Sequence, residues 1–592
     1  MTHLCREDIR ADPTPRVVRE RFVLPLLILL AASIGGCGSS DDPPVLGANA
    51  LLASLSIDGA AVLDPEFTPS VTSYSTTVGY QTSSTYVTAT VEDANATISV
   101  NGVTTTSGGA SDSIGLNVGN NSITITVTAE NNISQQIYTI AVDRQDPTFQ
   151  FINTRHLEWI YRDDEHFEGF RLALAADGEI LAAGDPTYGH PSDLDEDDLV
   201  EPNLSPYSSG AVYVFSPHSG YPRNRRSTVK ASNAEENDWF GVSTSLSADG
   251  SVLAVGAHAE DSAATGVNGD KSNNDASGAG AVYVYARDNA DVWTPEAYIK
   301  ASNTDAGDRF GIRIALSDDG TTLAVGAGGE DSAAIGVNGD ETDNTAPDKG
   351  AVYIFTRHSG GVWTQQAYLK ASGTGTDFGV FGASVAISQD GDTLAVGGFH
   401  DGSEAVYVFT RYGGNTWAQQ AVAKASQPDA SDFFGLYSID LSNDGTTLAV
   451  GAHYEDSAAT GVNGDQSNND APESGAVHVF VRDNAGSWTL QAYVKGTISE
   501  AGHRFGRYVS LSADGSTLSV GSSGGFYVFT RDSNAAWSQS DYLTSSAAES
   551  GPTGFRERFA MSGDGTILAL EARVPDIAVG VGEHRAIHFF EL

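Results

Sequence analysis

A pattern of alternating apolar and polar residues recurs from the middle of the chain to its end, and residues 240–256 are its clearest copy. There an apolar run that includes Leu246 stops at Asp249-Gly250, and a second, almost wholly apolar run follows from Val252 to Val255. Such short runs bounded by turn residues predict buried strands. Asp-Gly between them predicts a tight hairpin, because both residues tolerate a positive φ. One hairpin has no core of its own, so its repetition predicts stacked sheets.

At this place in the repeated pattern an Asp-Gly turn occurs seven times, with glycines at Gly178, Gly250, Gly320, Gly391, Gly445, Gly515 and Gly565. Most units also contain a strand like Gly280–Tyr285 and a strand that begins with Trp, like Trp293–Lys300. Intervals of roughly 50 or 70 residues lie within or above the ~40–50 residues typical of propeller blades. Four strands in each of seven units predict an all-β fold with a seven-bladed β-propeller. A β-solenoid, or two smaller arrays, is the alternative.

The two ends of the repeat region indicate how the ring closes. The last unit stops at its third strand, Ala586–Phe590, and a segment with its own Trp, Leu157–Arg162, precedes the first unit. We expect this segment to pair with the C-terminal unit as its fourth strand, which would remove an exposed sheet edge. The alternative is a linker strand that packs elsewhere.

Five units contain a Phe-Gly pair, followed by Leu-Ala-Val-Gly or Leu-Ser-Val-Gly and then by a strand like Gly280–Tyr285. The pairs are Phe240-Gly241, Phe310-Gly311, Phe381-Gly382, Phe434-Gly435 and Phe505-Gly506. Over residues 150–592 these motifs resemble FG-GAP repeats, the blades of the integrin α-subunit head and of many bacterial surface proteins. The proline of the motif is missing, as in Gly256-Ala257-His258, and the first and last copies are degenerate. The resemblance implies an integrin α-like propeller. No Arg-Gly-Asp motif occurs, and integrin function is not carried over.

Residues 50–145 follow a different pattern, with alternation in Tyr86–Val91 and Ile123–Val127 and a turn at Asn101-Gly102. Short alternating strands at this spacing predict an N-terminal β-sandwich. The pattern from Leu55 to Arg144 resembles the cadherin-like β-sandwich domain of bacterial surface proteins. That resemblance implies a stalk that spaces or presents its neighbour, and a binding role is the alternative.

The first 37 residues are typical of a targeting segment. Basic residues precede the apolar run Phe22–Ile34, which is too short to span a bilayer and suits a signal peptide. Ile34–Cys37 resembles a bacterial lipobox. The resemblance implies lipidation at Cys37, removal of residues 1–36 and, with Gly38 next, transfer to the outer membrane or cell surface. An ordinary signal peptide is the alternative. Residues 38–49 form a polar tether, and the two cysteines, Cys5 and Cys37, leave no disulfide after cleavage.

The charge of the chain is strongly unbalanced, with 32 Lys and Arg against 76 Asp and Glu and a net charge of −44. Nucleic-acid binders need clustered positive charge, so the composition argues against a nucleic-acid partner. An acidic, solvated surface or cation binding fits it.

Calcium is the candidate cofactor, because three units contain a long loop rich in Asp, Asn and Gly. Such loops supply hard oxygen ligands and sharp turns. A polar loop held by Asx turns is the alternative. The Asp-Gly turns lack the flanking carboxylates of integrin calcium loops, and we predict plain hairpins there. The candidate ligands are Asp261, Asp270, Asp275, Asp331, Asp340, Asp456, Asp465 and Asp470.

The recurrent tryptophans occupy equivalent positions, which predicts packing between sheets for all five; they are Trp293, Trp363, Trp417, Trp488 and Trp537. We find no G-x-S-x-G, H-E-x-x-H or P-loop motif, and we expect no enzyme activity. The sequence therefore predicts a lipid-anchored cell-surface protein that adheres to a protein or glycan through propeller loops. One alternative is an extracellular enzyme acting on polysaccharide, which a non-repeated cluster of Asp, Glu, Arg or His at the central channel would favour. Another is a scaffold subunit of a surface complex, which an exposed apolar patch would favour.

Overall fold

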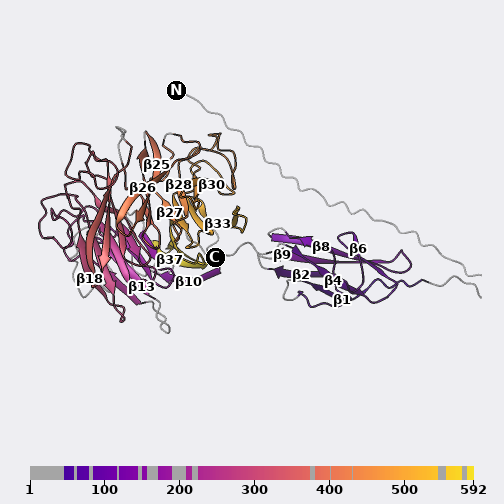
Figure 1. Cartoon of the computed structure of the whole chain (residues 1–592). Helices are drawn as coiled ribbons and strands as arrows, with labels where there is room; N and C mark the ends of the chain where they lie inside the picture. The colour runs from indigo at the N-terminus through magenta and orange to yellow at the C-terminus, as the bar shows by residue number, and fades with distance from the viewer. Residues whose placement is uncertain are drawn as a thin grey trace, which may run out of the picture. The chain divides into compact units, whose positions relative to one another are not determined.

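The computed structural model shows two compact units, each built of β-strands (Figure 1). The first comprises Met1–Val78 and Thr82–Asp143, and the second Gly79–Gln81 and Arg144–Leu592. No helix occurs in the part of the chain that the structure describes, and the prediction of an all-β protein is confirmed. The described residues are 46–58, 63–78, 84–116, 119–144, 150–156, 171–189, 208–216, 225–373, 380–400, 402–429, 431–544, 555–575 and 583–592.

The first unit has one hydrophobic core that residues of two sheets share. Its strands are β1 (Leu52–Ile57), β2 (Ser73–Val78), β3 (Ser84–Thr85), β4 (Val87–Val91), β5 (Thr97–Val100), β6 (Val103–Thr105), β7 (Ile114–Gly115), β8 (Gly119–Thr128) and β9 (Gln135–Arg144). One sheet has the order β2-β9-β8-β5-β6, and β1 pairs with β4 in another. Val87 and Ala89 of β4 share the core with Ile125 and Val127 of β8. The predicted alternation therefore directs one face of each sheet inward.

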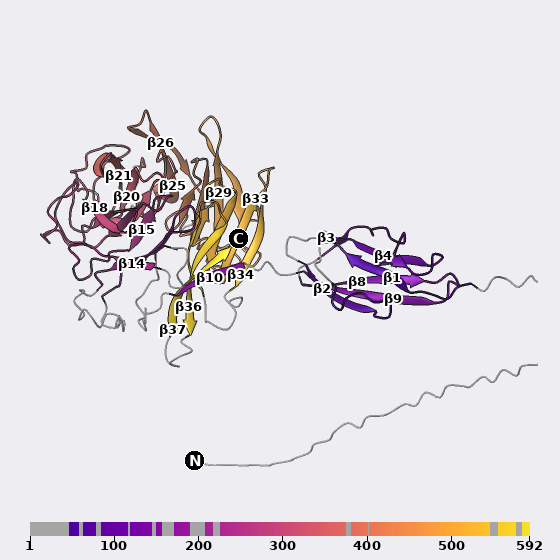
Figure 2. The same ribbon diagram turned by 90° about the horizontal axis from the view of Figure 1, so that it is seen from below.

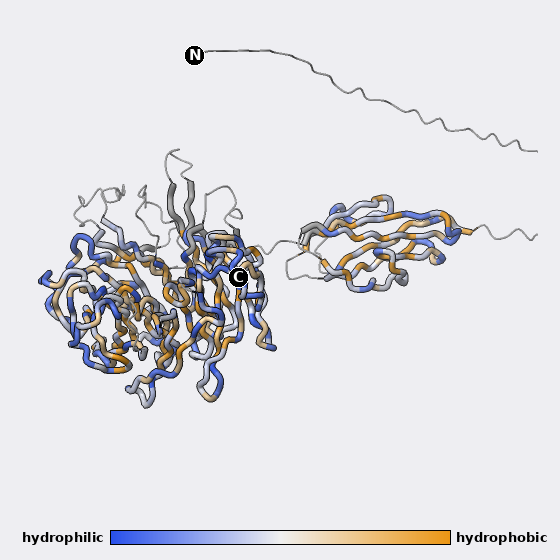
Figure 3. Tube along the Cα trace, turned by 90° about the horizontal axis from the view of Figure 1, so that it is seen from above, coloured by the Kyte–Doolittle hydropathy of each residue, from blue (hydrophilic) through white to orange (hydrophobic). Residues whose placement is uncertain are grey.

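The second unit contains seven antiparallel four-stranded sheets among its described residues. Six of them take consecutive strands: β11 (Arg171–Leu174), β12 (Leu181–Asp185), β13 (Ala211–Ser216), β14 (Arg225–Val229); β15 (Ser243–Leu246), β16 (Val252–Ala257), β17 (Ala281–Arg287), β18 (Trp293–Ile299); β19 (Phe310–Leu316), β20 (Thr322–Ala327), β21 (Ala351–His358), β22 (Val362–Leu369); β23 (Val385–Ile387), β24 (Thr393–His400), β25 (Ser403–Tyr412), β26 (Thr416–Ala423); β27 (Ile439–Leu441), β28 (Thr447–Ala452), β29 (Ala476–Arg482), β30 (Trp488–Val494); and β31 (Tyr508–Leu511), β32 (Thr517–Ser522), β33 (Gly525–Arg531), β34 (Trp537–Thr544). Hydrophobic residues follow these strands, and hydrophilic residues gather in the loops (Figure 3).

The seventh sheet joins the two ends of the unit. Its order is β10 (Gln150–His156), β37 (Glu583–Glu591), β36 (Ile567–Pro575) and β35 (Phe555–Met561), and β10 and β37 lie together in Figure 2. A strand that precedes the first sheet therefore completes the last one, and among the described residues 150–156 supply it, with Gln150 opposite Glu591. The predicted segment Leu157–Arg162 follows directly and lies outside the described residues.

The first strands of the seven sheets are neighbours in a closed order, from β11 through β15, β19, β23, β27, β31 and β35 back to β11. Backbone hydrogen bonds between Asp-Gly turns follow the same order. Ala176 N donates to Ala248 O (3.0 Å), and Gly563 N of the last turn donates to Ala176 O of the first (3.0 Å). The first strands therefore form a ring around an axis, with the Asp-Gly turns at one end.

The Phe-Gly motif forms the contact between adjacent sheets. Phe310 is fully buried and packs edge-on against Tyr353 and Phe355, with ring centroids 5.4 and 6.1 Å away. A Cβ atom on Gly256 of the preceding sheet would lie only 2.0 Å from the carbonyl oxygen of Gly311. Such a distance is far below van der Waals contact, so only glycine allows this approach. Equivalent close approaches occur at Gly184, Gly326, Gly397 and Gly451.

The Asp-Gly turns are hairpins, as predicted, but they are longer than a two-residue turn. Ser247 N donates to Val252 O, which leaves four residues between them. Only the glycine has a positive φ, +61° at Gly250. Asp249 instead accepts hydrogen bonds at Oδ1 from Ser247 Oγ (2.7 Å) and Ser251 N (2.9 Å). The carboxylate therefore holds the turn itself.

The tryptophans pack between sheets, as predicted, and four of them also bond to the preceding sheet. Trp417 is 3% exposed, and its Nε1 donates to Gln366 Oε1 of β22 (2.7 Å). Its own sheet places Arg411 5.6 Å from the ring centroid. The equivalent indole bonds join Trp363 to Glu296, Trp488 to Gln420 and Trp537 to Gln491.

Gly326→Ala tests the contact between sheets. A Cβ at Gly326 would lie 2.3 Å from Gly382 O, which is backbone and cannot move aside. We expect a loss of at least about 1–3 kcal/mol in the free energy of unfolding, as for overpacked cores. The matched control is Gly328→Ala, two residues away, where a Cβ meets nothing within 4 Å. Urea unfolding followed by Trp fluorescence measures both variants, and equal stability would contradict the role assigned to the glycine contact.

Candidate functional site

The three long loops leave the second strand of a sheet and return to the edge of its fourth strand. In one loop, Val337 forms an isolated bridge with Leu369 of β22. Asn338 then donates from its N to Tyr368 O (2.7 Å) and accepts at Oδ1 from Tyr368 N (2.9 Å). Asn338 has φ +52°, a conformation in which asparagine is enriched. Asn268 and Asn463 repeat this arrangement. Each loop thereby covers part of an exposed sheet edge.

The predicted metal ligands accept hydrogen bonds from their own loops. Asp331 Oδ1 accepts from Asp348 N (2.8 Å), and Asp340 Oδ1 accepts from Thr342 N (3.0 Å) and Oγ1 (2.7 Å). Equivalent bonds are made by Asp261, Asp270, Asp456 and Asp465, whereas Asp275 and Asp470 are exposed. Within the described residues no three His, Cys, Asp or Glu side chains lie close enough together to hold a metal. The bonds of Asp270, Asp340 and Asp465 to the residue two positions on are the Asx turns of the alternative interpretation. Those of Asp261, Asp331 and Asp456 instead close the loop across 17 residues, and calcium binding stays a prediction.

Sequence reasoning missed a buried ion pair at the base of each long loop. Lys370 Nζ lies 2.6 Å from Glu330 Oε2, with the two side chains 3% and 1% exposed. The same carboxylate accepts from Tyr368 Oη (2.7 Å), Asn303 Nδ2 (3.1 Å) and Ser332 N (3.2 Å). Pairs Lys300–Glu260 and Lys495–Glu455 repeat it at 2.8 and 2.7 Å. The sequence signal that could have revealed the pair is the Lys at the end of each of these fourth strands together with the Glu at the start of each long loop.

The Lys370–Glu330 pair is linked to the preceding sheet through Asn303. This residue donates to Glu330 and belongs to the connection between β18 and β19. Burial lowers the pKa of Lys370, and the negative charge of Glu330 opposes that shift. Burial also raises the pKa of nearby Asp308 to about 7; the Asp305 amide opposes this shift, and the charges of Glu330 and Asp305 reinforce it. Asp238 and Asp432 are shifted alike, to about 7. Repetition in three loops indicates a structural role for these groups.

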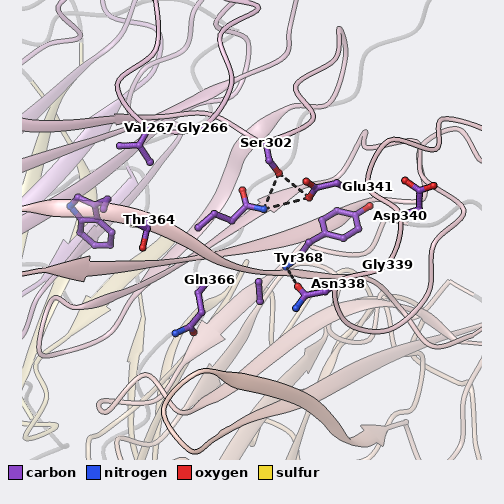
Figure 4. A pocket seen from close by; sticks show the side chains of 13 residues that line it. Gly266, Val267, Ser302, Asn338, Gly339, Asp340, Glu341, Thr364, Gln366 and Tyr368 are labelled. Carbon is purple, nitrogen blue, oxygen red and sulfur yellow. Dashed lines mark hydrogen bonds between the residues drawn. The ribbon is translucent and has the colours of Figure 1, made fainter.

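A groove of about 690 Å³ opens beside β22, between two neighbouring long loops (Figure 4). Gly266 and Val267 come from one loop, and Asn338 to Glu341 come from the other. Glu341 Oε2 accepts from Ser302 Oγ (2.8 Å), and Gln365 Nε2 donates to the same hydroxyl (2.8 Å). Of the predicted metal ligands, Asp340 lies on this groove. The lining combines amide, hydroxyl and carboxylate groups with a larger share of apolar surface, which includes Val267, Trp363 and Tyr368. The polar groups can bind a ligand rich in hydroxyl groups.

The groove differs from the equivalent places on two other sheets. Where Glu341 contacts Ser302, the other loops place Lys271 against Ser232 and Gln466 against Ser426. Where β22 has Gln365, β18 and β30 have Pro295 and Leu490. Among the three sheets with a long loop, the combination of Gln365 and Glu341 thus occurs in one, whereas the ion pair beneath it occurs in all three.

Two family models match parts of the chain. Residues 52–145 match the cadherin-like beta sandwich domain, and residues 293–355 match the FG-GAP repeat. No curated protein matches the sequence. The second match runs from β18 through the first three strands of the following sheet. The chain thus contains a cadherin-like domain and an FG-GAP repeat, which supports a β-propeller.

Several solved structures resemble the chain weakly. A protein from Lactobacillus plantarum is 13% identical over 64% of this chain and 95% of its own, with a TM-score of 0.40. The periplasmic gluconolactonase PpgL of Pseudomonas aeruginosa is 16% identical over 66% and 93%, with a TM-score of 0.34. The Dos1 propeller is 12% identical over 79% and 88%, with a TM-score of 0.39. Because all three scores are below 0.5, the fold assignment depends on the sheets described above.

A search for membrane-crossing helices gave none among the residues described.

Lys370→Met tests the buried pair. It leaves the carboxylate of Glu330 buried without its cation, which typically costs about 3–5 kcal/mol. We expect a loss of this size in urea unfolding, with partial recovery in the double variant Lys370→Met/Glu330→Gln. The control is Glu473→Gln in the exposed pair with Arg504, 2.8 Å apart, where a loss below about 1 kcal/mol is expected. Equal losses in the free energy of unfolding for Lys370→Met and Glu473→Gln would contradict the distinction between the buried and the exposed pair.

The three shifted aspartates predict a pH dependence. Folding holds a proton on Asp238, Asp308 and Asp432 up to about pH 7, whereas the unfolded carboxyls lose it near ~3.9. The folded state therefore binds more protons between these values, and stability falls as pH rises through that window. We expect the melting temperature of the triple Asp→Asn variant, relative to the unchanged protein, to increase from pH 5 to pH 8. His453 and His478 act in the opposite direction below pH 6.5, but they are common to both proteins. A difference in melting temperature between the two proteins that does not change with pH would refute the raised pKa values of these aspartates.

Proposed function

We propose that this chain is a cell-surface recognition protein that binds a glycan in the groove beside β22. The groove carries the proposal. Its volume of about 690 Å³ lies within the ~300–1,000 Å³ usual for ligand sites. Glu341, Gln365 and Asn338 supply acceptors and donors along it, and such groups match the hydroxyls of a sugar. A protein ligand is the alternative retained from the sequence.

We infer that the seven sheets are the blades of one closed seven-bladed propeller, and that the first unit is a β-sandwich acting as a stalk. The closed order of the first strands and the strand exchange between β10 and β37 support the first inference. The shared core of two sheets and the match over residues 52–145 support the second. This division assigns presentation to the stalk and binding to the propeller.

The location of the protein belongs to the proposal. Lipidation at Cys37 would anchor the chain to the outer membrane or cell surface, with residues 38–49 as a tether. A two-chain or three-chain lipid anchor holds a protein firmly. Residues 1–45 lie outside the described part of the chain, so this step depends on the lipobox resemblance alone. Mass spectrometry of the native N-terminus would test it.

The proposal needs neither calcium nor catalysis. Asp340, the candidate ligand on the groove, is an Asx-turn acceptor for Thr342. Glu341 is bonded to Ser302. Both carboxylates can still accept bonds from sugar hydroxyls through their remaining lone pairs.

Glycan-array binding followed by titration calorimetry tests the groove. We expect one glycan class to bind, and Gln365→Ala and Glu341→Gln to weaken it at least about tenfold, the equivalent of ~1.4 kcal/mol. Gln466→Ala, at the position equivalent to Glu341 on another loop, is the matched control and should leave the affinity unchanged. Each titration is run with Ca²⁺ and with chelator, and we expect equal affinities.

The other outcomes separate the alternatives. Affinity lost in chelator would place calcium in the site, and release of reducing ends during the titration would show a hydrolase. Absence of glycan binding, or equal weakening in Gln466→Ala, would overturn the groove as the binding site.

A further inference from the structure

The groove beside β22 is lined by two carboxylates and by no basic side chain. Asp340 and Glu341 belong to its lining, and the described lining residues include no Lys, Arg or His. Lys370 lies beneath the groove, but its side chain is only 3% exposed and is paired with Glu330 at 2.6 Å. A ligand in the groove therefore meets negative charge that no lining residue neutralises.

Glu341 uses one of its two carboxylate oxygens inside the groove. Oε2 accepts hydrogen bonds from Ser302 Oγ (2.8 Å) and Gln365 Nε2 (3.4 Å), as Figure 4 shows. Oε1 accepts none from the part of the chain that the structure describes, and no described base pairs with this carboxylate. The side chain is half-buried. A ligand that covers it removes water from a charge, which is unfavourable unless the ligand itself supplies strong donors or a positive charge.

The lining side chains offer acceptors, while most of their donors are already bonded. Trp363 Nε1 and Tyr368 Oη donate to carboxylates outside the groove, at 2.8 and 2.7 Å. Gln366 Nε2 donates to an amide oxygen of the next sheet (3.0 Å). Gln365 Oε1, in contrast, is buried without a hydrogen-bond partner among the described residues. Together with Oε1 of Glu341, this pattern favours a ligand that donates hydrogen bonds.

The negative charge of Glu341 is not needed for packing. Lys271 and Gln466 occupy its position on the other two long loops. Each of them contacts a serine, as Glu341 contacts Ser302. The same place in the fold thus holds a positive, a neutral or a negative side chain, and the negative one is found at the groove.

We propose that the groove selects glycans that carry an unacetylated amino group, and that Glu341 determines this specificity. The inference rests on the function proposed above, since it specifies the ligand of the same groove. A protonated amine has three N–H donors, no acceptor and a positive charge, so it forms charge-assisted hydrogen bonds with a carboxylate oxygen. A hydroxyl or acetamide group in its place lacks the charge, and an acidic sugar is repelled.

Calorimetric titration of the whole protein with three disaccharides tests this specificity. Cellobiose, N,N′-diacetylchitobiose and chitobiose share one backbone and carry hydroxyl, acetamide and ammonium groups, respectively, at the same carbon atoms. The titrations are run at constant ionic strength and at about pH 6, below the ~7.7–8.0 at which an α-amino group loses its proton. We expect chitobiose to bind with a stoichiometry near one and at least tenfold more tightly than either of the others.

Three variants test whether Glu341 is responsible. Glu341→Gln and Glu341→Lys copy the residues of the other two loops, so both should fold. The first should reduce the affinity for chitobiose to that for cellobiose, and the second should abolish chitobiose binding. The matched control is Glu473→Gln, which removes one negative charge from an exposed pair elsewhere and should leave the preference unchanged. Thermal unfolding followed by Trp fluorescence verifies that each variant keeps its fold.

The results that would overturn the specificity are distinct from those that would overturn glycan binding. Equal affinities of the unchanged protein for cellobiose and chitobiose would leave glycan binding intact and refute the specificity. A preference that persists in Glu341→Gln, or that Glu473→Gln also removes, would show attraction by the net charge of −44 and not by the groove. Absence of binding by all three disaccharides would also refute it, and the glycan array then decides separately whether the groove binds a glycan.

Discussion

Close approach of glycine backbones between adjacent sheets is the constraint on which the second unit depends. A Cβ at Gly256 would overlap Gly311 O, and the same is true where Gly451 meets Gly506. This contact brings the first strands near enough for the Asp-Gly turns to bond to one another around the axis. With the glycines in place, buried Phe and Trp side chains fill the wider outer space between sheets. Ring geometry thus follows from small residues inside and large aromatic residues outside.

Repetition separates structure from function in this chain. The Lys–Glu pair, the turn aspartates and the edge asparagines recur in several sheets, each with a satisfied set of hydrogen bonds. Their role is to hold long polar loops against sheet edges. The combination of Gln365 with Glu341 occurs in only one of the three sheets that carry a long loop. In a repeat array, residues that packing requires are equivalent in every sheet. Positions that packing does not constrain can differ between sheets, and such positions are available for binding a ligand.

Much of the architecture could be predicted from the sequence, because its signals are local. Asp-Gly turns, apolar runs and Trp positions predict strands and sheets without knowledge of partners. Two features could not be predicted this way. The closing strand is set by register with β37, and the buried Lys370–Glu330 pair joins residues 40 positions apart. The loop aspartates are a different case: an Asx turn and a calcium ligand require the same residue type, so the sequence leaves both interpretations open and calcium binding stays a prediction.

The distribution of charge limits which ligands can reach the groove beside β22. The chain has a net charge of −44, and an acidic exterior repels polyanions at distances up to about a Debye length, near 8–10 Å at physiological ionic strength. A glycan without negative charge, the ligand proposed for the groove, is not repelled by this net charge. The composition that argues against a nucleic-acid partner is therefore compatible with the proposed ligand.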